Sequence, residues 1–265
     1  MILLSNILAI FRRELQSYFS SPLSFIFATL FWFLGGILFI TLLIGPQGIV
    51  TVVAIEEQRG IPLPPIDVAS EFLKIFLGVI GALALFLLPL LSMGLYAEER
   101  KQGTLELLAT SPLTNWSVAV GKLLGVVTFF SVLLLPMMVL ELIAFSGAEP
   151  AFPLSIFLLS HLGLVLLAAA ILSLGMFISS LTESSLIAAV MTFSLVLMLW
   201  LIDLIGDRLS GWLGDAIKHL SLLRHYNNFL EGVFDSSSVI LLSSYIVLGV
   251  ILTSQSIEYL RFARR

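Results

Sequence analysis

Long apolar runs alternate with short polar segments along the whole chain. A helix that crosses a bilayer needs about 20 apolar residues, because the hydrocarbon layer is roughly 30 Å thick and a helix rises about 1.5 Å per residue. The pattern predicts six such spans, at about residues 23–44, 75–96, 121–145, 154–178, 184–205 and 239–258. The runs are continuous and do not alternate with period two, which excludes a transmembrane β-barrel. We therefore predict an all-α membrane protein with a single transmembrane domain over residues 1–265.

Residues 5–21 precede the first span and have a different pattern. Four apolar residues recur at helical spacing, and charged and polar residues such as Arg12 and Arg13 occupy the opposite face. The apolar residues are Leu8, Phe11, Leu15 and Tyr18. This arrangement is typical of an amphipathic helix that lies in the membrane interface. The alternative is a charged flank that anchors the first span.

Composition strengthens the membrane assignment. Apolar residues make up 59% of the chain and charged residues only 11%, against about 25% charged residues in a typical soluble domain. A soluble fold could not cover its surface with so few charges. The net charge of −4 is too small to indicate a partner, and nothing points to nucleic acid. The absence of cysteine excludes disulfides and thiol catalysis, and three histidines leave little material for a metal centre.

The distribution of lysine and arginine predicts the orientation. If the N-terminus is cytoplasmic, eight basic residues lie on the cytoplasmic side and five on the other side. The five are spread over the long segments 45–74 and 206–238, and basic residues in long segments influence the orientation less than those in short ones. We therefore expect both termini to be cytoplasmic.

The segment 97–116 between the second and third spans holds the densest charge cluster. Four charged residues, 98–101, end the second span, and Gly103 then breaks that helix. Thr104 is a good N-cap for a short helix over residues 105–110. A short helix held between two spans suits contact with a soluble partner. The alternative is an ordinary solvated loop, since a charge run usually is one.

Few charges fall inside the spans, where they are costly. Glu141 lies near the outer end of its span, so we expect its carboxylate to reach the interface. We interpret His161 as a packing or helix–helix hydrogen-bonding residue. Glu183 lies in the tight turn after the fourth span, where capping or charge pairing is expected. Gly121 and Gly125 form a GxxxG pair that allows close helix packing.

The outer segment 206–238 mixes apolar and charged residues without reaching span length. Short helices that dip into the outer leaflet would fit this pattern. The alternative is an ordinary surface helix with an aromatic anchor.

Residues 99–114 (ERKQGTLELLATSPLT) resemble the loop after the second span of type-2 ABC exporter permeases, in particular the gliding-motility-type branch. Three other segments resemble that family at matching positions. They are the N-terminal helix at 11–22 (FRRELQSYFSSP), the turn at 179–189 (SSLTESSLIAA) and the element before the sixth span at 222–235 (LLRHYNNFLEGVFD). The resemblance covers essentially the whole chain in the right order.

The resemblance implies an export permease in a bacterial-type plasma membrane, surrounded by lipids. It would pair with a second copy or a related permease and with separate ATPase subunits that bind ATP and Mg²⁺. The coupling loop 97–116 and the N-terminal helix would transmit closure of the ATPases. The implied contact residues are Glu98, Glu99, Arg100, Gly103, Thr104, Leu105 and Glu106 in the loop, and Arg12, Arg13 and Glu14 in the helix.

The chain itself is predicted to bind no cofactor and to catalyse no reaction. A phosphate-binding Walker motif requires GxxxxGK[ST], and the one Gly-Lys pair, Gly121-Lys122, is followed by Leu123. The alternatives are a secondary transporter, which would need ion-coupling carboxylates or broken helices at mid-membrane, and an intramembrane enzyme, which would need a catalytic pair at that depth. Nothing in the sequence identifies the substrate.

Overall fold

The computed structural model describes residues 2–60, 67–104, 114–148, 152–206, 208 and 211–262. Every regular element within these ranges is a helix. In chain order they are α1 (Ile2–Ser20), α2 (Pro22–Ile44), α3 (Ile49–Gln58), α4 (Val68–Ser92), α5 (Gly94–Lys101), α7 (Asn115–Phe145), α8 (Leu154–Leu181), α9 (Ser185–Gly206), α10 (Trp212–His219), α11 (Leu222–Leu230) and α12 (Ser236–Phe262). Within the described part of the chain, six helical segments are long and apolar enough to cross a membrane. The predicted all-α architecture with six spans is therefore confirmed.

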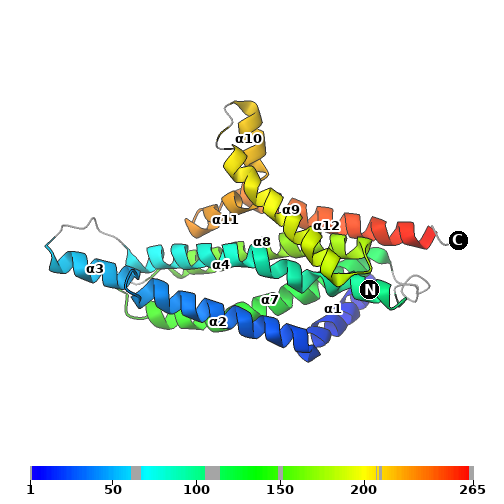
Figure 1. The fold of residues 1–265 in the computed structure, drawn as a ribbon, viewed down its shortest axis with the longest axis horizontal. Helices are drawn as coiled ribbons and strands as arrows, with labels where there is room; N and C mark the ends of the chain where they lie inside the picture. The colour runs from blue at the N-terminus through cyan, green and yellow to red at the C-terminus, as the bar shows by residue number, and fades with distance from the viewer. Residues whose placement is uncertain are drawn as a thin grey trace.

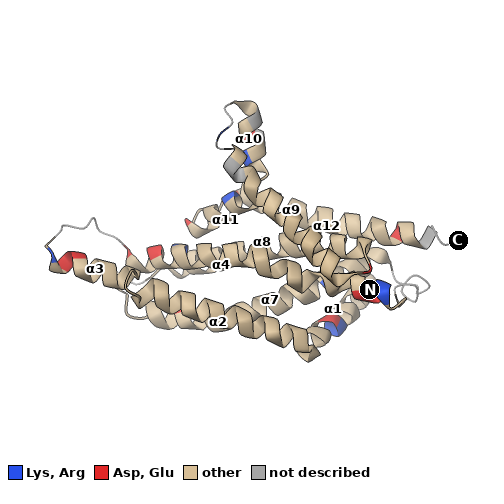
Figure 2. Cartoon of the chain, in the orientation of Figure 1, with Lys and Arg blue, Asp and Glu red and all other residues tan. Residues whose placement is uncertain are grey.

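The long helices run side by side, and both ends of the chain lie at the same end of the bundle (Figure 1). The helix α3 lies toward the opposite end. Charged residues gather near the two ends of the bundle, whereas the long helices between them are almost free of charge in the described residues (Figure 2). This distribution fits a layer of hydrocarbon around the middle of the bundle.

The helices α4 and α7 begin in the polar residues that precede their apolar segments. Asp67 caps α4, because its carboxylate accepts hydrogen bonds from the backbone N–H groups of Ala69 and Ser70. Thr114 caps α7 in the same way through the N–H of Ser117. The helix α4 continues into α5 through Met93, whose backbone is also helical. These extensions explain why α4 and α7 are longer than the predicted spans.

Two parts of the chain outside the spans are also helical. The helix α3 lies in the long segment between the first two spans, where no helix was predicted. The helices α10 and α11 lie in the segment 206–238, where short helices were expected.

The core of the bundle is formed around α8, which contacts α4, α7, α9, α11 and α12. Small residues such as Ala168 and Ala170 are fully buried there and let neighbouring helices approach closely. By contrast, α2 and α9 expose many large apolar side chains, such as Phe33 and Met198. In water such surfaces would be unfavourable, so these helices are suited to contact lipid or another membrane helix.

Candidate functional site

The helix α1 lies close against the first half of α7 because two glycines leave room for it. Gly121 faces Ile10 and Gly125 faces Glu14, and a Cβ atom on either glycine would stand 2.8 Å from the facing side chain. Any larger residue would therefore push α1 away. The GxxxG pair serves close helix packing, as predicted.

The inward face of α1 differs in part from the predicted apolar stripe. Leu15 and Tyr18 of the stripe pack against the core of the bundle, and the Tyr18 ring stacks on Phe129 with centroids 5.1 Å apart. Leu8, however, is exposed, and Glu14 faces α7. The predicted stripe did not include Glu14, whose inward orientation is made favourable by a cation of α7.

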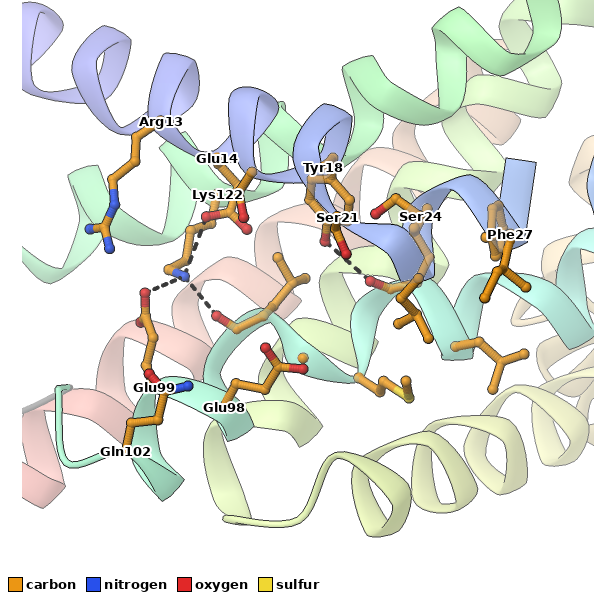
Figure 3. Close-up of a pocket in the computed structure, with 18 of the residues that line it drawn as sticks. Arg13, Glu14, Tyr18, Ser21, Ser24, Phe27, Glu98, Glu99, Gln102 and Lys122 are labelled. Carbon is orange, nitrogen blue, oxygen red and sulfur yellow. Dashed lines mark hydrogen bonds and ion pairs between the residues drawn. The ribbon is translucent and has the colours of Figure 1, made fainter. Parts of the chain in front are cut away.

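That cation is Lys122, which is buried near the start of α7. Its Nζ atom lies 2.9 Å from the Glu99 Oε1 atom and 3.5 Å from the Glu14 Oε2 atom (Figure 3). It also donates a hydrogen bond of 2.7 Å to the Leu95 carbonyl. The Lys122 side chain is only 5% exposed, and a buried ammonium is tolerated only when it is paired and hydrogen-bonded. Lys122, Glu14 and Glu99, here called the charged cluster, therefore hold α1, α5 and α7 together.

The charged cluster contains two carboxylates and one ammonium. Burial raises the pKa of Glu14; Lys122 opposes this rise, and Glu99 adds to it. The Oε2 atom of Glu99 is buried without a hydrogen-bond partner. The cluster therefore carries an excess of negative charge that is poorly solvated, and removal of its cation would be costly.

A serine in the last turn of α8 holds the junction between α4 and α5. The Ser179 hydroxyl accepts hydrogen bonds of 3.0 Å from the backbone N–H groups of Tyr96 and Ala97. It donates one of 2.7 Å to the Met93 carbonyl. One side chain thus satisfies N–H groups in the first turn of α5, which are otherwise unpaired at a helix start.

Arg100 makes a second link to the same turn. Its Nη1 atom donates a hydrogen bond of 3.0 Å to the Ser180 carbonyl, and its Nε atom lies 3.5 Å from the Glu183 Oε1 atom. The charge-pairing role predicted for Glu183 is confirmed. The movement of α5 is therefore linked to that of both α8 and α9.

The helix break predicted at Gly103 is also present. Gly103 has φ of +70°, a conformation that favours glycine, and it follows the end of α5 at Lys101. The N–H and hydroxyl groups of Thr104 donate to the Glu99 carbonyl. The short helix predicted at 105–110, with Leu105 and Glu106, lies outside the described residues.

The other candidate contact residues divide into two groups. Arg12, Arg13 and Glu98 are exposed, whereas Glu14 and Glu99 are bound to Lys122. Sequence reasoning missed the role of Lys122, because its carboxylate partners are 108 and 23 residues away in the chain. The available signal was the lysine itself, which stands in an apolar run and must find an anion there.

A second ionisable pair lies inside the spans, between α7 and α8. Glu141 is 0% exposed, so the prediction that it reaches the interface was wrong. Its Oε2 atom lies 3.3 Å from the His161 Nε2 atom, and the His161 Nδ1 atom lies 2.9 Å from the Phe157 carbonyl. Because a carbonyl can only accept, Nδ1 carries a hydrogen, and the contact with Glu141 needs one further shared proton. The helix–helix role predicted for His161 is confirmed.

The helix α11 is buried in the bundle through an aromatic anchor. The Tyr226 hydroxyl donates a hydrogen bond of 2.8 Å to the Leu77 carbonyl of α4. Its ring lies directly over Gly81, where a Cβ atom would overlap it. Leu222 and Phe229 are also buried, so α11 is not an ordinary solvated surface helix.

A polar network joins α11 to the start of α12. The His225 Nδ1 atom lies 2.9 Å from the Ser238 hydroxyl, and its Nε2 atom lies 3.0 Å from the His219 carbonyl. The Ser238 hydroxyl also lies 3.1 Å from the Asp235 Oδ2 atom, to which it donates. Burial lowers the pKa of His225. A hydrogen bond from the backbone N–H of Ser237 lowers the pKa of Asp235.

Within the described ranges, no three histidine or acidic side chains come together in a way that could hold a metal ion. Within the described residues, side-chain contacts at the end of the bundle with both chain termini link α1, α5, α7 and α8.

Comparison with known protein families identifies the chain's relationship over more than half of its length. Residues 61–206, more than half of the chain, match the family model described as ABC-2 family transporter protein. No curated protein matches the chain.

Proposed function

This chain belongs to the ABC-2 family of transporter proteins, and from that premise we propose how it couples to its energy source. It is a multi-pass membrane permease component, and permeases of this family generally pair with ATPase subunits. Because the chain belongs to this family, the alternative of a secondary transporter is no longer needed. We propose an exporter in which two permeases form the path and separate ATPase subunits, carrying ATP and Mg²⁺, close beneath them.

The charged cluster is the observation that carries this proposal. Lys122 binds carboxylates from α1 and α5, and contacts of Arg100 and Ser179 link α5 to the last turn of α8. A push on α5 by an ATPase would therefore move several spans together. A loop without such links would absorb the push locally.

We assign different roles to the exposed and the bound residues. Arg12, Arg13 and Glu98, with Gly103, Leu105 and Glu106 of the coupling loop 97–116, would contact the ATPase directly. Glu14, Glu99, Arg100 and Thr104 would position α1 and α5 for that contact.

The environment of the chain follows from the same proposal. The basic residues and the common position of both chain ends (Figure 1) support cytoplasmic termini, and the resemblance to export permeases supports a bacterial-type plasma membrane. The helix α1 would lie at the membrane interface. The motifs at 11–22 and 99–114 support the gliding-motility-type branch. In the outer segment 206–238, α10 and α11 would dip into the outer leaflet and gate the exit.

Co-purification tests the proposal. A tagged chain, solubilised gently from its own cells, should bring down a nucleotide-binding subunit, and the complex should hydrolyse ATP. Replacing Glu99 and Arg100 by alanine should reduce that ATPase activity, since α5 loses its side-chain links to α7, to α8 and to Glu183 in the turn after α8. Arg59→Ala is the matched control, because Arg59 is exposed beyond the end of α3. Absence of any nucleotide-binding subunit, or ATPase activity unchanged in the double variant, would overturn the proposal.

A further inference from the structure

A cleft of about 360 Å³ lies between the corner of α1 and α2 on one side and the end of α4 and α5 on the other. Figure 3 shows α1 and the start of α2 along one wall and α5 along the facing wall. Its volume lies within the range of small-molecule sites, about 300–1,000 Å³. The charged cluster forms only its inner end. Apart from Arg13 and Glu98, the residues that line the rest of the cleft have no role in the coupling described above, and the experiments below test those two residues in the absence of an ATPase.

The lining of the cleft changes from polar to apolar along its length. Arg13, Glu98 and Gln102 line the end that is near the termini of the spans, and Phe27 lies at the far end (Figure 3). Beyond the corner at Ser21, the walls are formed by apolar side chains of α2 and α4 that are exposed on the outside of the bundle. These are Leu23, Ile26, Leu30 and Leu90. A ligand with one polar end and one apolar end would match both parts.

The charges at the polar end indicate the kind of polar group. The charged cluster uses the cation of Lys122 for its own two carboxylates. The remaining charges are the exposed Arg13 on α1 and the exposed Glu98 on α5, which have opposite signs and lie on facing walls. A guanidinium binds phosphate with two parallel hydrogen bonds, and a carboxylate accepts hydrogen bonds from an ammonium. The lining as a whole holds three carboxylates and two cations, which disfavours a ligand with a net negative charge.

We propose that this cleft binds one membrane phospholipid with a zwitterionic headgroup that carries a primary amine, of the phosphatidylethanolamine type. Arg13 binds the phosphate and Glu98 binds the ammonium, while an acyl chain lies against Ile26, Leu30 and Leu90. The lipid contacts α1, α2, α4 and α5 at once and fills the space beneath the α1–α2 corner. A choline headgroup lacks ammonium hydrogens, and a glycerol headgroup leaves a net negative charge, so both bind less well.

Native mass spectrometry of the purified full-length chain tests the site without any ATPase. The chain is equilibrated with equal amounts of phosphatidylethanolamine, phosphatidylcholine and phosphatidylglycerol that share the same acyl chains. We expect one retained lipid per chain, with the ethanolamine lipid preferred. Arg13→Gln and Glu98→Gln should each lower its retention by about tenfold, the usual effect of losing one charged hydrogen bond. The controls are Arg12→Gln, one residue away but outside the cleft, and Glu258→Gln, an exposed carboxylate on α12.

A photo-crosslinking measurement on the otherwise unchanged chain keeps the proposal testable if a charge variant folds poorly. With p-benzoylphenylalanine at Ile26, the main adduct should be the ethanolamine lipid. The same probe at Ile40, which is exposed on α2 outside the cleft, should label the three lipids equally. Equal retention of all three lipids, preference for phosphatidylglycerol, or unchanged retention in both charge variants would overturn the proposal. A crosslink from position 26 to a second copy of the chain would also overturn it.

Discussion

Replacement of Lys122 by methionine is the most direct test of the charged cluster. Methionine keeps most of the volume of the side chain and removes only the ammonium, so packing against α1 changes little. The carboxylates of Glu14 and Glu99 are then left buried next to each other without a cation. We expect a large loss of stability at the end of the bundle where α1, α5 and α7 meet.

The size of the loss follows from the distances. Two unit charges about 4 Å apart attract by about 4 kcal/mol at an effective dielectric constant of about 20. Lys122 has one carboxylate at 2.9 Å and another at 3.5 Å. Because burial of the ammonium offsets much of this attraction, the measured cost of removing one partner from a buried ion pair is about 3–5 kcal/mol. For a chain of this size, that loss lowers the melting temperature by roughly 6–20 °C.

Thermal unfolding in detergent, followed by tryptophan fluorescence, measures the effect. Lys74→Met is the matched control: its partner Glu231 is 3.8 Å away and both side chains are about half exposed, so its loss should cost less than about 1 kcal/mol. The triple variant Glu14→Gln, Glu99→Gln, Lys122→Met should recover most of the stability, because no uncompensated charge remains. If Lys122→Met melts together with the wild type, or if the triple variant is no more stable than the single one, the reasoning is refuted.

Three further predictions concern other contacts. Ser179→Ala should lower the stability by about 1–3 kcal/mol in the same melting assay, since two buried N–H groups lose their acceptor. Ser179→Thr keeps the hydroxyl and should be more stable than the alanine variant; equal melting temperatures of the two variants would contradict this explanation. Glu141→Gln should be tolerated, because its amide can donate to the His161 Nε2 atom. His161→Leu should cost about 1–3 kcal/mol, because it leaves a buried polar group without its partner; equal stability of these two variants would be inconsistent with the shared proton. Burial lowers the pKa of His225 below its usual 6.5, so the unfolded chain takes up more protons than the folded chain below about pH 6.5. The free energy of unfolding should therefore decrease as the pH is lowered below about 6.5, and it should decrease less steeply in His225→Gln. Parallel curves of stability against pH for the two proteins would contradict the prediction.

The spans could be predicted from sequence because each is an apolar run whose helical length matches the bilayer. Their starts could not, since Asp67 and Thr114 act through local caps that lie in polar flanks. The helix α3 was missed for a related reason: it follows Gly48 and ends in polar residues, so it lacks the length of a span.

The candidate site was predictable only in its exposed part. The charges at 98–101 and the break at Gly103 are local patterns. The links of Ser179 to α5 join residues that are 82–86 positions apart, and no periodicity encodes such a pairing. Glu141 was assigned to the interface because it lies near the end of its span, whereas a partner on another helix holds it inside.

The continuity of α4 with α5 has a consequence for the opposite face of the membrane. From Glu99 to Leu77 the two helices extend roughly 33 Å, close to the thickness of the hydrocarbon layer. Ser179 holds their junction at Met93. If α4 and α5 move as one rigid unit, a tilt of about 5° at α5 displaces Leu77 by roughly 3 Å. Since the Tyr226 hydroxyl holds the Leu77 carbonyl at 2.8 Å, α11 must either follow this displacement or lose its anchor.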